Sequence, residues 1–209
     1  MLMSAASTRC FAWLFGLIAI VFGGAALARP PVVDKAGATS CAFHARSEDR
    51  DPAGQNIRAA PRGDAEVVGR LPAMRKSESA GDYFVEVRVT GSKDGWFLID
   101  RAEFEDYDGG KEMALRMEGW ISGRYLQFDV EDAPVRAAPA KAAAVLDRAQ
   151  SGASVAGKSE YLQVGRALSC KGAWIEIEGD IHDADTRKPL RKVRGWVTGA
   201  CSNQVTTCS

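Results

Sequence analysis

The chain has 209 residues, of which 27 are basic and 27 are acidic, so its formal net charge is zero. This balance gives no sign of the basic face that a nucleic-acid-binding protein needs. The length allows two small domains or one of medium size, and the composition is that of an ordinary globular chain.

The first 28 residues are typical of an export signal. Arg9 is their only charged residue, an apolar run from Cys10 to Phe22 follows, and Ala26-Leu27-Ala28 offers a small-x-small cleavage site. This order predicts a signal peptide over residues 1–28 and a periplasmic or secreted protein. The alternative is an uncleaved N-terminal anchor, since only the length of the run and the Ala-x-Ala motif separate the two. No second such run occurs, so we expect no stable membrane insertion after cleavage.

Three short motifs occur twice, in the same order. Arg-Ala-Ala-Pro at residues 58–61 returns at residues 136–139, 78 residues later. Collinear matches of three motifs indicate a duplicated module. The other two motifs surround two pairs of tryptophans, Trp96 with Trp174 and Trp120 with Trp196. The expected organisation is a linker at 29–40, a first domain at 41–128 and a second domain at 129–208.

Within the repeats, apolar residues recur with a period of two. Every second residue from Tyr83 to Val89 is apolar, which predicts a strand with one buried face. Pro61 and Pro139 end the Arg-Ala-Ala-Pro strands, because proline cannot continue a sheet ladder. The alanine-rich residues 137–150 offer a helix as the alternative to the turn and strand that the repeat predicts there. The sequence therefore predicts an all-β fold.

Two segments, from Trp96 to Trp120 and from Trp174 to Trp196, are too long for structureless loops. Both are predicted to be long hairpins, because turn-forming residues lie near their middles. Residues 100–112 have a net charge of −4 and residues 182–194 a net charge of +3. Such charges protect exposed strands from edge pairing. A sharper hypothesis is that the acidic segment docks on the basic one.

Four cysteines follow the predicted signal, and an even number in an exported chain favours disulfides. If the second hairpin is centred between residues 185 and 186, Cys170 and Cys201 lie opposite each other at a separation that a disulfide can span. The sequence thus predicts the pair Cys170–Cys201 and, by elimination, Cys41–Cys208. The competing pair is Cys201–Cys208.

The first repeat contains Asn56-Ile57-Arg58-Ala59-Ala60-Pro61, then Val68-Gly69-Arg70-Leu71, then Gly119-Trp120-Ile121. This series resembles the motifs of bacterial SH3-like (SH3b) domains. The second repeat departs from them, with Pro134 where asparagine is usual. The resemblance implies two tandem small SH3-like barrels with extended hairpins. It also implies binding of peptides or cell-wall material outside the cytoplasm.

Aromatic residues are the candidate ligand-binding groups, because rigid flat side chains bind with little loss of entropy in a shallow groove. The alternative is that the tryptophans pack in the core, since tryptophan is highly buried on average. The candidates are Trp96, Trp120, Trp174, Trp196, Tyr83 and Tyr125.

Cys41 and His44, three residues apart, suggest a cysteine hydrolase acting on cell walls. A disulfide explains Cys41 better, because a nucleophile also needs a placed base and an orienting group. No compact metal-ligand set occurs, and we expect no cofactor and no metal. The leading hypothesis is an exported, non-enzymatic binding or scaffolding protein that recognises peptide, peptidoglycan or an envelope protein. The alternatives are the hydrolase and a purely structural subunit whose own hairpins fill its grooves.

Overall fold

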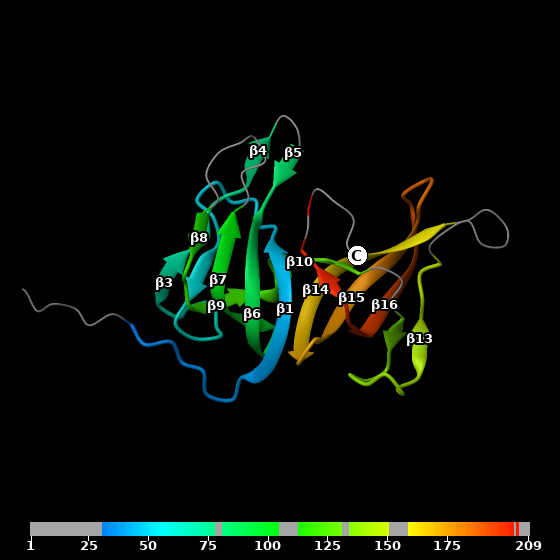
Figure 1. Cartoon of the computed structure of the whole chain (residues 1–209), viewed down its shortest axis with the longest axis horizontal. Helices are drawn as coiled ribbons and strands as arrows, with labels where there is room; N and C mark the ends of the chain where they lie inside the picture. Colours follow the sequence, from blue (N-terminus) through cyan, green and yellow to red (C-terminus); the bar gives the residue numbers. More distant parts are fainter. Residues whose placement is uncertain are drawn as a thin grey trace, which may run out of the picture.

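The computed structural model describes residues 31–77, 81–104, 113–130, 134–150, 159–202 and 204. Within these ranges the chain forms strands and one short 3-10 helix, which confirms the predicted all-β class. Two β-rich bodies lie side by side, joined where β1 and β14 meet (Figure 1). The predicted signal peptide lies outside the described residues. No helix in the described ranges is long and apolar enough to cross a membrane.

The first half is built on an eight-stranded sheet of order β10-β1-β6-β7-β9-β2-β3, with β8 also paired to β7. Strands β4 and β5 form a separate hairpin. The elements are β1 (Thr39–Ser47), β2 (Asn56–Arg58), β3 (Val67–Arg70), β4 (Arg75–Ser77), β5 (Gly81–Tyr83), β6 (Val85–Lys93), β7 (Trp96–Phe104), β8 (Met113–Leu115), β9 (Gly119–Ser122), the 3-10 helix η1 (Gly123–Tyr125) and β10 (Leu126–Gln127).

The second half is a five-stranded sheet of order β13-β12-β16-β15-β14, beside a two-stranded pair of β11 and β17. Neither large sheet is closed by a pairing between its end strands among the described residues, so closed barrels are not observed. The elements are β11 (Asp129–Val130), β12 (Val135–Arg136), β13 (Val145–Asp147), β14 (Glu160–Lys171), β15 (Trp174–Asp183), β16 (Pro189–Val197) and β17 (Ala200–Cys201).

The local patterns predicted from the sequence are present. Tyr83, Val85, Val87 and Val89 are all buried, so the period of two marks the inner face of this sheet. Residues 137–150 form turns and β13, and the alternative helix is not formed. The hairpin of β15 and β16 is also confirmed, while the turn predicted near residues 106–110 lies outside the described residues.

The two Arg-Ala-Ala-Pro blocks make the same contacts. Arg58 pairs with Trp120 across β2 and β9, as Arg136 pairs with Trp196 across β12 and β16. The Nη1 atom of Arg58 donates to the carbonyl seven residues ahead at 2.7 Å, and that of Arg136 does the same at 2.7 Å. The repeated motif therefore encodes a repeated local structure, a strand and turn locked by its own arginine.

A single hydrophobic core runs through both halves. Phe43 on β1 packs edge-on against Phe97 of β7 and Phe128, with ring centroids 6.1 and 5.9 Å apart. A Cβ added at Gly123 in η1 would lie 2.5 Å from the carbonyl oxygen of Ala167 on β14, so the two halves approach backbone to backbone. The halves are therefore packed together as one body.

A disulfide joins Cys41 on β1 to Cys170 on β14, with Cα atoms 5.7 Å apart. The predicted pairs Cys170–Cys201 and Cys41–Cys208 are therefore wrong. The reason is that the chain reverses at residues 172–173, so Cys170 lies on β14 and faces Ile175, one strand away from the hairpin of β15 and β16. Cys201 is disulfide-bonded as well.

Candidate functional site

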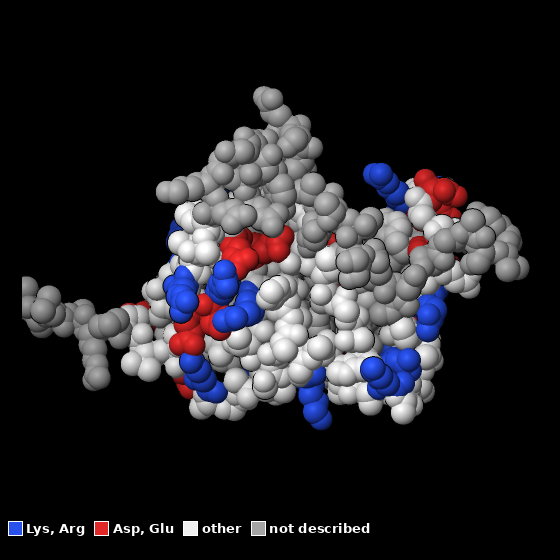
Figure 2. All heavy atoms as spheres, in the orientation of Figure 1, with Lys and Arg blue, Asp and Glu red and all other residues white. Residues whose placement is uncertain are grey.

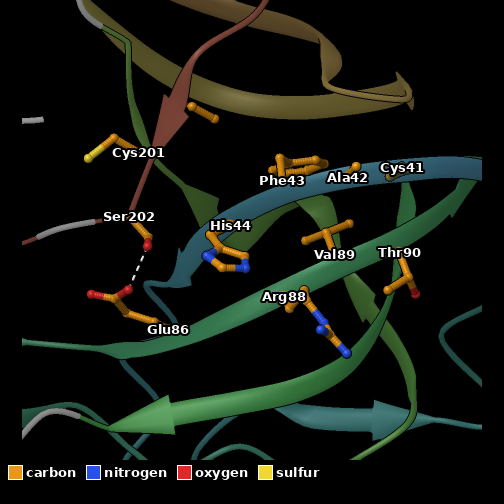
Figure 3. Close-up of a pocket in the computed structure, with 11 residues that line it drawn as sticks. Cys41, Ala42, Phe43, His44, Glu86, Arg88, Val89, Thr90, Cys201 and Ser202 are labelled. Carbon is orange, nitrogen blue, oxygen red and sulfur yellow. Dashed lines mark hydrogen bonds between the residues drawn. The ribbon is translucent and has the colours of Figure 1, made fainter. Parts of the chain in front are cut away.

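An open cavity of about 730 Å³ lies where β1, β6 and β17 converge (Figure 3). Its walls combine apolar groups with polar side chains from strands that are far apart in the sequence. The lining residues are Cys41, Ala42, Phe43, His44, Glu86, Arg88, Val89, Thr90, Ala200, Cys201 and Ser202.

The alternation of β1 and β6 explains which side chains reach this cavity. Phe43 and Val89 point into the core, so their neighbours His44 and Arg88 point to the opposite face. His44 lies directly across from Arg88, and Arg88 lies across from Arg101 on β7. Three basic residues therefore stand in a row across three strands.

Acidic neighbours balance this row. Arg88 donates two hydrogen bonds to Asp100, at 2.7 and 2.6 Å, and Arg101 pairs with Glu103. The hydrogen bonds from Arg88 lower the pKa of Asp100 below its ordinary value. Figure 2 shows charged side chains of both signs gathered on this face of the first half. His44 is exposed, and its imidazole ring has no hydrogen bond or ion pair with any described residue.

The C-terminal end of the described chain forms the third wall. The hydroxyl of Ser202 donates to Glu86 at 2.5 Å. The side-chain amide of Gln204 both donates to the carbonyl oxygen of Phe84 and accepts from its N–H, each at 2.8 Å. These two hydrogen bonds resemble those between paired β-strands, with the Gln204 side chain in place of a backbone. They hold the end of the second half over the first.

The aromatic residues proposed from the sequence do not line this cavity. Trp120 is fully buried, and Tyr83 is buried with its ring 5.3 Å from that of Phe104. Three further tryptophans are half-buried at strand positions in their own halves: Trp96, Trp174 and Trp196. Tyr125 is half-buried in η1.

Of the cavity residues, the sequence had singled out only the cysteines Cys41 and Cys201 and His44, for a disulfide or a hydrolase, while the predicted ligand-binding residues were all aromatic. The sequence does contain a signal for the other cavity residues. Glu86, Arg88 and Thr90 alternate with the buried valines of β6 and therefore lie on the opposite face of the strand. Pairing this face with His44 and Ser202 required the tertiary fold, because Ser202 lies 116 residues from Glu86 in the sequence.

The hydrolase alternative depends on a free thiol at Cys41. That sulfur is bonded to Cys170, so in this structure it is not available as a nucleophile next to His44. Across the described ranges, no group of three or more His, Cys, Asp or Glu residues could hold a metal ion.

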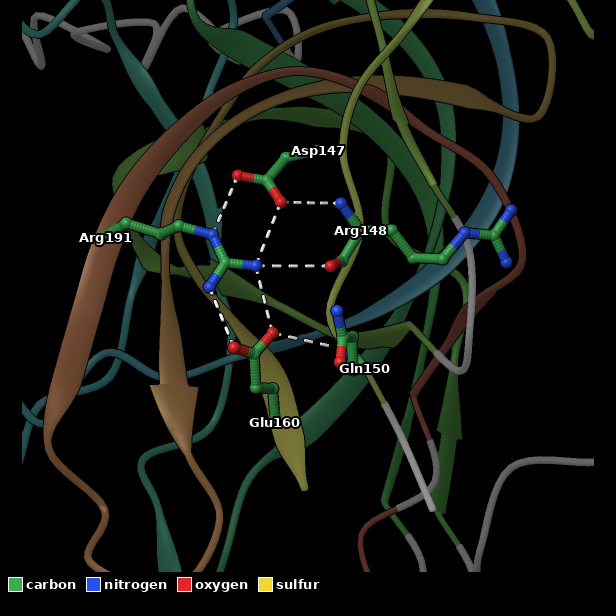
Figure 4. Close-up of polar contacts among 5 residues, drawn as sticks. All are labelled: Asp147, Arg148, Gln150, Glu160 and Arg191. Atoms are coloured by element: carbon green, nitrogen blue, oxygen red, sulfur yellow. Dashed lines mark hydrogen bonds and ion pairs between the residues drawn. The ribbon is translucent and has the colours of Figure 1, made fainter. Parts of the chain in front are cut away.

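The basic segment of the second hairpin pairs within its own half. Arg191 on β16 bonds to Asp147 on β13, at 3.0 Å through Nε and Nη2, and to Glu160 on β14, at 2.9 Å through both Nη atoms (Figure 4). These hydrogen bonds lower the pKa of both carboxyl groups. Arg191 thus bridges the two end strands of the five-stranded sheet. The described charges of the acidic segment, Asp100 and Glu103, pair with first-half arginines, so the predicted docking between the segments is not seen among them.

In comparisons with known proteins, no family model, curated protein or solved structure matches the chain.

Proposed function

We propose that this protein is an exported, non-enzymatic binding or scaffolding protein of the bacterial envelope. It is built from two SH3-like units, and it recognises peptide, peptidoglycan or an envelope protein. The observation that supports this best is the cavity between β1, β6 and β17, whose walls carry apolar surface and polar groups together.

The chemistry of the cavity favours a ligand that carries a carboxylate. His44 and Arg88 lie side by side on adjacent strands, and the His44 ring has no partner among the described residues. Arginine and histidine are suited to bind carboxylates, and Glu86 nearby suits an amine. Cell-wall stem peptides and protein C-termini both carry such groups. The disulfide is compatible with an oxidising compartment.

Co-sedimentation with purified peptidoglycan sacculi tests the proposal. The wild-type chain is expected to pellet with the sacculi, and the variants His44→Ala and Arg88→Ala are expected to pellet several-fold less. Arg62→Ala is the matched control, because Arg62 is an exposed arginine of the same half that pairs only with nearby Asp64 among the described residues. If sacculi do not bind, in-cell cross-linking through a probe at residue 44 must capture an envelope protein. Failure of both experiments contradicts the proposal.

A purely structural subunit is the second candidate. The observation that favours it is that residues 31–38 of the chain's own N-terminal segment bond over Trp120, one of the proposed binding residues. A protein that fills its own aromatic surface needs no external ligand there.

A further inference from the structure

In the first half, the N-terminal segment at residues 31–38 lies on the outer face of the sheet, over Trp120. The indole N–H of Trp120 donates to the carbonyl oxygen of Asp34 at 2.7 Å. The N–H of Asp34 donates to the carbonyl oxygen of Ala59 at 2.7 Å, and Lys35 pairs with Glu118. Trp120 belongs to this outer face and not to the inner core, because its neighbour Ile121 is the residue that joins the core.

The same surface recurs in the second half, where its tryptophan is more exposed. Trp196 occupies the place of Trp120, since it pairs with Arg136 as Trp120 pairs with Arg58. Trp120 is fully buried, whereas Trp196 is only half-buried, and its indole N–H has no acceptor among the described residues. Ala60 is buried in the first half, and its counterpart Ala138 is exposed.

Among the described residues, no segment bonds to the Trp196 side chain as residues 31–38 bond to Trp120.

The charge beside the tryptophan is reversed between the two halves. Glu118, two residues before Trp120, receives Lys35, whereas the residue two before Trp196 is Arg194. Arg194 and Lys192 lie on the same outer face of β16 as Trp196. Both line a depression of about 510 Å³, together with Arg166 and the carboxylates Glu178 and Asp180. Two residues before the tryptophan, an occupant therefore meets the cation Arg194 in the second half, where the first half presents the anion Glu118. Across from Trp196 lies Glu176, which pairs with Arg194.

Arg194 can exchange its present partners for a ligand. It reaches Glu176 at 3.2 Å and Glu178 at 3.5 Å, and its side chain is 63% exposed. Ion pairs this exposed contribute little to stability, so a bound carboxylate can replace them.

We propose that the outer face of β12 and β16 around Trp196 binds an extended acidic segment of a partner protein. A backbone carbonyl of that segment accepts from Trp196, and a carboxylate one residue later pairs with Arg194. The site is separate from the cavity of β1, β6 and β17 and goes beyond the function proposed for it. The chain's own N-terminal segment, taken from a second copy, fits poorly because Lys35 would meet Arg194.

Two synthetic peptides test the proposal on the full mature chain. One has the sequence of residues 31–40, and the other carries Lys35→Glu. With binding measured by calorimetry, the Lys35→Glu peptide is expected to bind about 5- to 10-fold more tightly, the ratio that opposite and like exposed charges produce. Arg194→Glu is expected to reverse this order, and Lys188→Glu, an exposed lysine in the same half, is expected to leave it unchanged.

Trp196→Ala is expected to weaken both peptides at least tenfold. If that variant does not fold, Trp196→Phe keeps an aromatic ring, removes the N–H donor and is expected to weaken binding. The proposal is overturned if neither peptide binds saturably, if the order survives Arg194→Glu, or if the Lys35 peptide binds more tightly. The last result would identify a second copy of this chain as the occupant. Loss of binding in His44→Ala, with Trp196→Ala unaffected, would place the peptide in the cavity and also overturn it.

Discussion

Removal of the Cys41–Cys170 disulfide is expected to destabilise the protein strongly without changing its fold. The two cysteines are 129 residues apart in the sequence, and closing a loop of that length lowers the entropy of the unfolded chain by an amount worth roughly 5 kcal/mol. Measured effects are usually smaller, so we expect about 2–4 kcal/mol for the double variant Cys41→Ala with Cys170→Ala. For a chain of this size that lowers Tm by roughly 5–15 °C.

The hydrogen bonds around the disulfide explain why the fold should persist. The N–H of Ala42 donates to Gly172 at 2.8 Å, and the N–H of Gly172 donates back to Ser40 at 2.8 Å. Circular dichroism at low temperature should therefore match the wild type, and thermal scans give the Tm. Ser92→Ala, which removes one hydrogen bond to the Cys170 N–H at the same junction, is the control and should cost only about 1 kcal/mol. A double variant that melts within about 1 °C of the wild type would refute the reasoning.

Three further outcomes follow from the described contacts. Arg191→Gln should lower the free energy of unfolding at pH 7 by about 1 kcal/mol after allowance for solvent screening. Because the pKa values of its two carboxylate partners are lowered in the folded state, this difference from wild type should persist above about pH 4 and vanish as the pH falls through the lowered values. Urea titrations at several pH values measure it. Gly195→Ala should cost roughly 1–3 kcal/mol in the same assay, since its Cβ would lie 2.6 Å from a carbonyl oxygen of β12, whereas Gly63→Ala, with no atom within 4 Å, should be neutral. Peptide mass mapping of the unreduced protein should recover Cys201 linked to Cys208, and a free thiol at either would contradict this pairing.

Strand placement could be predicted from the sequence because it depends on local periodicity. The alternation from Tyr83 to Val89 and the prolines that end the repeated blocks are read from neighbouring residues. The second hairpin was predicted because its flanking strands are nearly symmetric about one turn, and Ile175 does pair with Val197. Closure of the sheets is a different matter, since it depends on pairings between strands that are distant in the sequence.

The disulfide and the cavity could not be predicted for the same reason. The predicted pair Cys170–Cys201 requires the second hairpin to extend outward to Cys170, but the chain reverses at Gly172, and Cys170 lies on the next strand, β14. The burial of Trp120 depends on residues 31–38, which lie in the segment predicted from the sequence to be a linker. In the structure a backbone carbonyl from that segment accepts a hydrogen bond from the indole N–H, and the residues next to Trp120 in the sequence do not indicate this contact.

Each half covers part of a strand edge of the other, and this limits where partners can bind. In the first half, β1 covers the edge of β6 along most of its length, whereas β11, the strand that precedes β12 in the second half, has two residues and pairs with β17. The edge of β14 is therefore covered by the first half, where its Cys170 N–H donates to Ser92. In return, Gln204 closes the exposed backbone of Phe84. Because these edge positions are used internally, strand addition at them is blocked, whereas the His44 cavity and Trp196 lie on outer faces.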